Sequence, residues 1–440
     1  MGVGDPREQK GGRTGGPQPL ALVVLTRDPT GRMTGRKSVL ATAADSLERS
    51  GLRVAVVVLS RHPVPPVWHG RPVHRVPLPP LGRVALTAAG VVLGRRGTLN
   101  EALFDSRRVR RSIALLAARL RADVVVADGL RTTGPAMACG LPVVVHLDDL
   151  LSDRYANVAA GPDGSGTDVL GFFATQLPRA LRGPAGAVAR RLVGLEAGRA
   201  DRRERELAGS VAAVALTSQD EADELSRRAG RPIAALPMAV ALRDPGRPDL
   251  ADPCSFVFLG LLDYAPNRAA LRWWVSEVAP ALRALGGGDV VLTVVGQQTA
   301  AAPELEGPGI RFTGYLEDLG AELRRHRGMV APVLSGAGVK TKVLDGWSVG
   351  LPVVATPAGA AGCSSGAGLL VAEGAPAFAA AVVRLRDDAS LAAHTGRAGR
   401  EVLEREWSPA AVGDRWAATV LPLLPGPPPA PSSPAAPTTA

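Results

Sequence analysis

The sequence predicts an α/β fold made of two Rossmann-like, doubly wound domains that face each other across a cleft. Short apolar runs alternate with helical segments, which is the pattern of a parallel sheet covered on both faces. The alternation stops at a stretch rich in Pro, Asp, Gly and Arg, residues 243–252, and then resumes. A length of 440 residues suits two domains that each bury their own core.

The N-terminal domain is expected to span residues 18–242, after a loose segment, residues 1–17, that is rich in glycine and charged residues. Apolar and β-branched runs predict its strands at Leu20–Leu25, Val54–Leu59, Asp123–Ala127, Pro142–Leu147 and Val211–Leu216. Helical periodicity predicts helices at Ser38–Ser50, Thr133–Cys139 and Gln219–Arg228, and a helical region over 150–208. Gly51 follows the first helix and suits its C-terminal end.

Residues 243–252 are the expected linker, and the C-terminal domain is expected to span 253–405. Its strands are predicted at Phe256–Leu259, Val290–Val295, Ile310–Thr313, Met329–Pro332 and Pro352–Ala355. Its helices are predicted at Ala269–Leu285, Leu319–Arg325, Ala375–Asp387 and Ser390–Glu404. Residues 406–424 predict a C-terminal helix that packs back on the N-terminal domain. Residues 425–440 form a disordered tail, since only Pro, Ala, Ser and Thr follow Gly426.

Composition and charge limit the classes of function that this chain can have. With 46% hydrophobic and 21% charged residues, the chain is globular. A net charge of +10 favours nucleic acid or anionic lipid as a partner. No zinc-ligand spacing, aromatic strand motif or helix-turn-helix pattern accompanies it, so no nucleic-acid partner is expected. Arginine clusters at 107–111 and 199–205 are interpreted as solvated helix faces, with peripheral contact to anionic lipid as the alternative.

Cysteine usage and hydropathy bear on the compartment. The three cysteines are scattered among small or apolar residues, which is neither a disulfide framework nor a metal-ligand spacing. Residues 20–25 are too few to cross a bilayer. We therefore expect a cytoplasmic protein, with membrane association left open, that needs no metal.

The most informative segment is Leu334–Pro357, which predicts a glycine loop at Ser335–Gly338, a helix of about three turns ended by Gly350, and a buried strand. Loop, helix and strand in this order cradle phosphate on a helix N-terminus in many α/β proteins. Lys340 and Lys342 lie near the first turn, where a cation opposes the helix dipole unless an anion is bound. Lysine occurs at only four positions among the 51 Lys and Arg residues. The alternative is an exposed helix start with a salt bridge from Lys342 to Asp345.

Two further groups lie at ends of predicted strands in the first domain. The loop Gly31–Lys37 could close over a diphosphate, with Gly35 facing the cleft, although a plain βα turn fits equally well. His146, Asp148 and Asp149 follow a strand end, where catalytic groups of α/β enzymes gather. Helix capping is the alternative role for each aspartate.

The second half resembles the family 4 glycosyltransferases, which are retaining enzymes of the GT-B fold. The resemblance rests on the order and spacing of six segments: Phe256–Asn267, Arg272–Trp274, Val294–Gln297, Phe312–Leu319, Val330–Asp345 and Gly350–Pro357. In the first half, Leu141–Tyr155 is similar to the acceptor-side domain of some members.

The resemblance implies roles for residues of the opening motif. Asp345 takes the position of the acid that binds the donor ribose, and Ala337 stands where the family has an acid facing the donor sugar. The diphosphate is then left to the backbone of Ser335, Gly336 and Gly338 and to Lys340 and Lys342. Leu261 and Leu262 replace the family's Arg and Lys after the first strand, which leaves Arg268 as a weaker substitute. The backbone of Gly314, Tyr315 and Leu316 is expected beside the nucleobase.

The resulting hypothesis is a glycosyltransferase that moves a hexose-type sugar from a nucleoside diphosphate-sugar donor to an acceptor hydroxyl with retention of configuration. The acceptor is a glycan, a lipid-linked molecule or a small molecule, and no cofactor is expected. Fixed cations and helix-end amides stabilise the departing diphosphate without a metal. The alternatives are a non-catalytic nucleotide-sugar-binding protein of the same fold, a nucleotide-sugar 2-epimerase, and a basic nucleic-acid binder.

Overall fold

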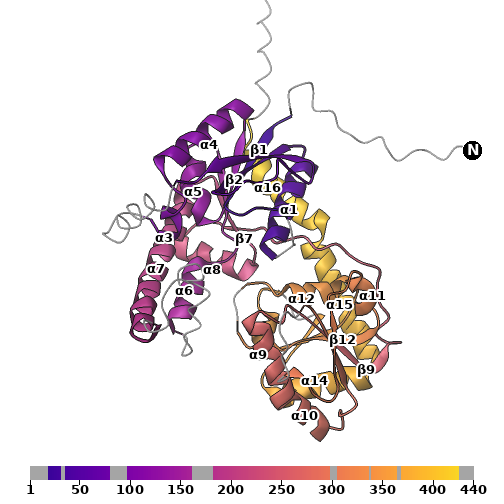
Figure 1. Cartoon of the computed structure of the whole chain (residues 1–440). Coiled ribbons are helices and arrows are strands. Elements are labelled where there is room, and N and C mark those ends of the chain that lie inside the picture. Colours follow the sequence, from indigo (N-terminus) through magenta and orange to yellow (C-terminus); the bar gives the residue numbers. More distant parts are fainter. Residues whose placement is uncertain are drawn as a thin grey trace, which may run out of the picture.

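A computed structural model describes residues 18–30, 35–79, 97–160, 182–297, 305–335, 338–363 and 368–425. The chain forms two α/β domains, with the N-terminal one at the upper left of Figure 1 and the C-terminal one at the lower right. The expected loose N-terminal segment, Gly336, Ala337 and nearly all of the expected tail lie outside the described residues.

The N-terminal domain holds an eight-stranded sheet in the order β3-β4-β2-β1-β5-β6-β7-β8. Its strands pair in parallel except for β3 and β4, and they are β1 (Leu20–Leu25), β2 (Arg53–Ser60), β3 (Val67–Trp68), β4 (Arg71–Pro77), β5 (Val124–Asp128), β6 (Val143–His146), β7 (Ala213–Leu216) and β8 (Ala234–Ala235). One face is covered by α4 (Arg107–Leu120), α5 (Leu130–Met137), α7 (Arg182–Ser210) and α8 (Gln219–Ala229). The other face is covered by α1 (Gly35–Arg49) and by α16 (Pro409–Val420). Two more helices are α3 (Leu99–Ala102) and α6 (Leu151–Ala160).

The C-terminal domain holds a six-stranded parallel sheet in the order β11-β10-β9-β12-β13-β14. Its strands are β9 (Asp252–Leu259), β10 (Val291–Val295), β11 (Ile310–Gly314), β12 (His326–Ala331), β13 (Val353–Ala355) and β14 (Leu369–Val371). One face packs on α9 (Ala265–Trp273), the π-helical turn η3 (Trp274–Val278), α10 (Ala279–Ala284) and α14 (Ala375–Asp387). The other packs on α11 (Leu319–Leu323), α12 (Thr341–Ser348) and α15 (Ala389–Trp407). A short α13 (Pro357–Ala360) and a closing 3-10 turn η6 (Leu421–Leu423) complete the elements.

The buried strands explain why the sequence predicts this fold. All six residues of β1 and all three of β13 are buried and apolar, without polar alternation, whereas β12 is fully buried although it begins with His326 and Arg327. In each sheet the strand order reverses beside the first strand, between β1 and β5 and between β9 and β12. Doubly wound sheets bind ligands at such points, outside the carboxyl ends of the strands.

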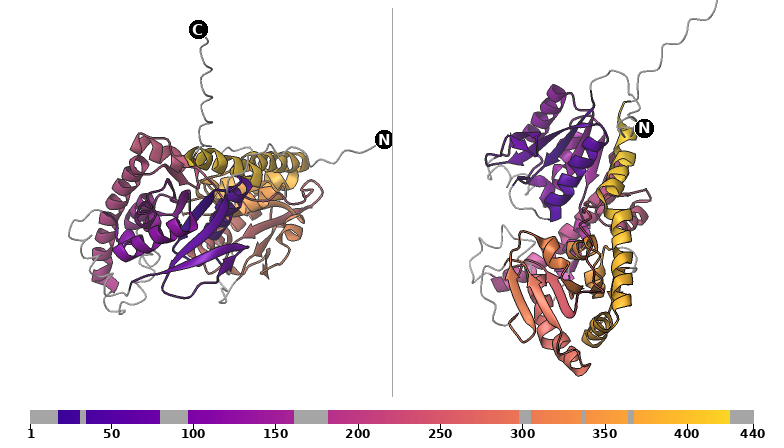
Figure 2. Two further views of the ribbon diagram at one scale, coloured as in Figure 1. Left: turned by 90° about the horizontal axis from the view of Figure 1, so that it is seen from above. Right: turned by 90° about the vertical axis from the view of Figure 1, so that its right-hand side faces the viewer.

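The chain passes between the domains twice. It crosses first after β8, where the backbone N–H of Val240 donates to the Trp407 carbonyl at 2.8 Å. It returns at Ser408, which caps α16 and follows the last residue of α15. Val412, Trp416 and Val420 of α16 are buried in the N-terminal core, although the two preceding helices belong to the C-terminal domain. Figure 2 shows these C-terminal helices, in yellow, running along one side of both domains.

The GT-B fold expected from the resemblance is confirmed, and the differences are local. The helix of the opening motif begins at Thr341 and has eight residues, so it is shorter than the expected three turns. Gly350 does follow its end, with φ of +75°. Strand β4 was not expected because it contains Pro72 and Pro77, and it lies near the sheet edge, where a missing N–H is tolerated.

Candidate functional site

A cavity of about 630 Å³ lies at the carboxyl edge of the C-terminal sheet. It is lined by residues that end β9 and β10, by the start of α12, and by Gly35 of the N-terminal domain. The cavity therefore lies between the domains and beside the strand-order reversal of the C-terminal sheet. Its volume falls in the range of small-molecule sites.

Lys342 is the most unusual residue of this cavity because it is only 9% exposed. Its Nζ donates to Asn267 Oδ1 at 2.8 Å and lies 4.1 Å from the centre of the Phe258 ring. Burial, followed by repulsion from Lys340, lowers the pKa of Lys342 to about 7. An anion bound beside it would restore the charged form.

Gly260 makes the contact between Lys342 and Asn267 feasible. A Cβ at position 260 would lie 2.4 Å from Asn267 Nδ2, so the asparagine side chain occupies the space that glycine leaves. Asn267 Nδ2 donates to the Leu261 carbonyl at 3.0 Å, which orients its Oδ1 toward the lysine. Leu261 thus orients the Asn267 side chain through its backbone carbonyl.

The remaining residues of the phosphate hypothesis lie around the start of α12. Lys340 is the N-cap residue of α12, its side chain does not cap the helix, and its Nζ donates to the Gly338 carbonyl at 2.7 Å. Ser335, Lys340 and Gly35 all line the cavity, while Gly338 adopts φ of +74°, which favours glycine. The structure thus brings Gly35, Ser335, Lys340 and Lys342 together. Arg268 instead donates to the Leu262 carbonyl at 3.4 Å.

Asp345 also lines the cavity, one turn after Lys342. Its Oδ1 lies 3.5 Å from Arg243 Nη1, which comes from the linker. Burial raises the pKa of Asp345 to about 6, and the arginine opposes that rise. Asp345 therefore forms its ion pair with Arg243. It does not form the alternative salt bridge with Lys342, which points to Asn267.

The expected nucleobase residues follow β11 on another side of the same cavity. Tyr315 and Leu316 line it, and the tyrosine side chain is 70% exposed. Gly314 has φ of +71°, and its carbonyl accepts from the Gly296 N–H at 3.0 Å. This bond joins the ends of β10 and β11 and positions the loop that carries Tyr315.

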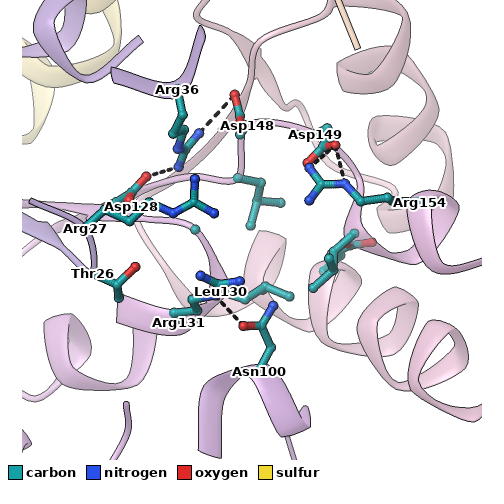
Figure 3. Close-up of a pocket in the computed structure, with 14 residues that line it drawn as sticks. Thr26, Arg27, Arg36, Asn100, Asp128, Leu130, Arg131, Asp148, Asp149 and Arg154 are labelled. Atoms are coloured by element: carbon teal, nitrogen blue, oxygen red, sulfur yellow. Dashed lines mark hydrogen bonds and ion pairs between the residues drawn. The ribbon is translucent and has the colours of Figure 1, made fainter. Parts of the chain in front are cut away.

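The three strand-end residues of the N-terminal domain have different environments. Asp148 has φ of +77° and accepts from Thr217 Oγ1 at 3.1 Å. It pairs with Arg36 Nη1 at 3.1 Å (Figure 3). Burial alone would raise the pKa of Asp148, but the charge of Arg36 lowers it overall. Asp149 pairs with Arg154, so both carboxylates are ionised partners of arginines.

His146 is buried behind the sheet edge. Its Nε2 donates to the Leu236 carbonyl at 2.7 Å, and its Nδ1 accepts from the Asp148 N–H at 3.3 Å. The ring stacks on Trp416 of α16, with centroids 6.0 Å apart. Burial and then repulsion from Arg36 lower the pKa of His146. Both ring nitrogens are thus occupied, and the geometry gives the imidazole a structural role in place of the expected catalytic one.

The sequence analysis missed Arg36, Asp128, Asn267 and Arg243 as parts of these sites. Arg36 forms an ion pair with Asp128 at the end of β5 and donates to the His146 carbonyl at 3.1 Å. Asp128 could have been found by the strand-end rule that selected Asp148, since both follow parallel strands. The pairing of Asn267 with Lys342 joins residues too far apart for local patterns to reveal.

The described residues contain no group of three or more His, Cys, Asp or Glu arranged to hold a metal ion. No described helix has the length and apolar content needed to span a bilayer. The arginines of the two clusters differ: Arg203 and Arg205 pair with Glu101 and Asp201, whereas Arg107 and Arg108 are exposed on α4.

Both halves of the chain match protein-family models. Residues 34–239 match the model described as glycosyl transferase 4-like domain, and residues 253–388 match the model described as glycosyl transferases group 1. The boundary between the two matches falls within the expected linker region. A search of curated proteins found no match.

Solved structures share the fold over nearly the whole chain. A sucrose-phosphate synthase from Thermosynechococcus elongatus is 16% identical with a TM-score of 0.62, over 92% of this chain and 99% of that one. HepE from Anabaena, in complex with UDP and glucose, is 14% identical with a TM-score of 0.57, over 91% and 99%. A mutant of S. aureus TarM in complex with fondaparinux, alpha-GlcNAc-glycerol and UDP is 10% identical with a TM-score of 0.59, over 91% and 99%.

Proposed function

The protein is a glycosyltransferase of the GT-B fold, and we propose that it transfers a sugar from a nucleoside diphosphate donor to an acceptor hydroxyl. The observation that carries the proposal is a buried lysine, Lys342, beside the N-terminus of α12 on the wall of the interdomain cavity. Structures of HepE with UDP and with UDP-glucose support a nucleotide-sugar donor.

In this proposal the diphosphate lies against Lys340, Lys342 and the first backbone amides of α12. The helix dipole and two ammonium groups favour the same anion, and the ammonium of Lys342 donates to a neutral amide oxygen of Asn267. Asp345 accepts from the ribose hydroxyls, and the loop at Tyr315 contacts the base.

We further propose that transfer proceeds with retention and without a metal. Cleavage of the bond between sugar and phosphate leaves negative charge on the diphosphate, which the fixed cations stabilise. Arg36 lowers the pKa of Asp148, and Arg154 is paired with Asp149, so the departing phosphate is the better acceptor for the hydroxyl proton. The two aspartates then position the donor sugar or the acceptor.

Calorimetric titration with UDP, GDP and dTDP tests donor binding, and released nucleotide in a donor screen tests transfer. Lys342→Ala should weaken diphosphate binding at least ten-fold while leaving the bare nucleoside unchanged, because only the phosphate contact is lost. Equal losses for both ligands contradict the phosphate assignment. Activity should persist in excess EDTA, and its loss on chelation contradicts the metal-free proposal. Binding without any transfer identifies a non-catalytic protein.

A further inference from the structure

A second cavity, of about 150 Å³, lies at the carboxyl edge of the N-terminal sheet (Figure 3). It forms where β1 and β5 end, the point at which the strand order of this sheet reverses. Four arginines line it, contributed by the end of β1 and by α1, α5 and α6: Arg27, Arg36, Arg131 and Arg154. The activity proposed above uses Asp148 and Asp149 of this cavity to position the donor sugar or the acceptor, but it assigns no ligand to the arginines.

Two of the four arginines are neutralised by neighbouring acids. Arg36 contacts Asp128 and Asp148, and Arg154 Nε donates to Asp149 Oδ2 at 2.8 Å. The fourth acid of the wall, Glu204, accepts from Ser152 Oγ at 2.6 Å, and burial raises the pKa of its carboxyl. The acids of the cavity are therefore already paired or hydrogen-bonded.

Arg131 and Arg27 are not neutralised. Arg131 donates through Nε to Asn100 Oδ1, as the dashed line in Figure 3 shows, and its guanidinium lies 5.7 Å from the Phe104 ring centre. Within the part of the chain that the structure describes, neither Arg131 nor Arg27 has a carboxylate at ion-pair distance. Burial, followed by repulsion from Arg27, lowers the pKa of Arg131. Four arginines and four acids line the cavity as a whole, and the part of the lining where positive charge is in excess is the one formed by Arg131 and Arg27.

The backbone at the start of α5 adds to this excess. Gly129 is the N-cap residue, with φ of +75°, and has no side chain that could accept from the first-turn amides. Gly129, Leu130 and Arg131 all line the cavity, so the uncapped helix start borders it. A cation in the first helical turn opposes the dipole, as at Lys342, unless an anion is bound there.

We propose that this cavity binds a phosphate group of the acceptor, through Arg131, Arg27 and the first amides of α5. The proposal rests on the transferase function and specifies its acceptor class as phosphorylated. Guanidinium forks match phosphate oxygens bidentately, which favours phosphate over a neutral sugar.

Size and position agree with this assignment. The cavity admits a phosphate and the atoms next to it but is well below the size of a nucleotide site, which the larger cavity satisfies. The two cavities adjoin at the start of α1, because Gly35 lines the larger one and Arg36 the smaller. An acceptor anchored by its phosphate can therefore extend its hydroxyl toward the donor sugar.

Thermal stabilisation of the full chain by glycerol phosphate, compared with glycerol, tests the anion site without needing a donor. Arg131→Met and the exposed Arg27→Met should each raise the apparent Kd for glycerol phosphate at least ten-fold. Lys342→Met, in the donor cavity, and Arg119→Met, an exposed arginine of α4, should retain the wild-type response. Absence of any response in the wild type, or loss of the response only in Lys342→Met, overturns the proposal.

A transfer assay with the donor in excess tests the acceptor class. It compares two sources of a phosphorylated acceptor, a soluble sugar phosphate and a polyprenyl phosphate-linked sugar in detergent micelles. Transfer to either source, with a KM that rises at least ten-fold in Arg27→Met and unchanged donor binding, supports the proposal and identifies the source. Transfer to neutral sugars that Arg27→Met leaves unchanged overturns it. If glycerol phosphate binds through Arg131 but no donor is turned over, the proposed function fails and the anion site stands.

Discussion

The buried amine of Lys342 leads to a quantitative expectation about protons. With a pKa of about 7 in the unliganded protein, roughly 10% of this side chain is protonated at pH 8. A diphosphate beside the amine should restore the pKa to roughly the ordinary value of about 10.4, so that the bound lysine is fully charged. The amine should therefore take up about 0.9 proton on binding at pH 8 and only about 0.1 at pH 6.

The same linkage sets the pH dependence of affinity. Between pH 8 and pH 9 the Kd for the diphosphate should rise about ten-fold, because binding takes up about one proton at the Lys342 amine. The terminal phosphate, with a second pKa of about 6, is already ionised in this range and contributes no proton. The carboxyl of Asp345, with a pKa of about 6, is ionised as well.

Calorimetry in two buffers of different ionisation enthalpy measures this proton uptake directly. Lys342→Arg provides the matched control, since guanidinium stays charged and should bind with no buffer dependence. Lys342→Met should bind weakly and also without buffer dependence. A wild-type enthalpy at pH 8 that is identical in both buffers refutes the reasoning, whatever the affinity.

Three further predictions concern other residues. Asp345→Ala should weaken UDP and uridine by similar factors, about ten-fold, and leave pyrophosphate binding unchanged, because only the ribose contact is lost; calorimetry with the three ligands checks this. Glu221→Gln should stabilise the protein at pH 8 by about 1–3 kcal/mol and have little effect at pH 3, where this carboxyl is protonated in both the folded and the unfolded state. Burial, and then Asp149, raise the pKa of Glu221 to about 7, so the folded state binds more protons than the unfolded state between pH 4.5 and 7 and loses stability as the pH rises; urea unfolding at both pH values measures the difference. Trp416→Ala should lower the unfolding free energy by about 3–5 kcal/mol, because this side chain is 1% exposed; denaturant unfolding followed by circular dichroism tests it, and a loss below about 1 kcal/mol contradicts the packing of α16.

The fold was predictable because most fully buried parallel strands consist of consecutive apolar residues, as in β1 and β13. The start of α12 was predictable because glycine, lysine and helix signals occur within one short segment. The environment of Lys342 was not, since its partner Asn267 comes from α9 and meets it only when β9 and β12 pair. Long-range pairing of this kind leaves no local pattern in the sequence.

His146 shows that a local pattern can also fail to predict how a side chain packs. Its place at a strand end predicted a catalytic group, since parallel strands carry such groups at that edge. The side chain instead packs against Trp416, which reaches it from the far end of the chain. Strand position alone cannot distinguish a residue that faces the cavity from one that faces a covering helix.

The second passage of the chain between the domains has a consequence for biosynthesis. The sheet face formed by Leu25, Val56 and their neighbours is closed by α16, whose last residue is Val420. A nascent chain must therefore complete the entire C-terminal domain before its first domain can be finished. Until the ribosome releases that helix, the apolar face remains open, which makes this stage the one at which chaperone capture or aggregation is most favoured.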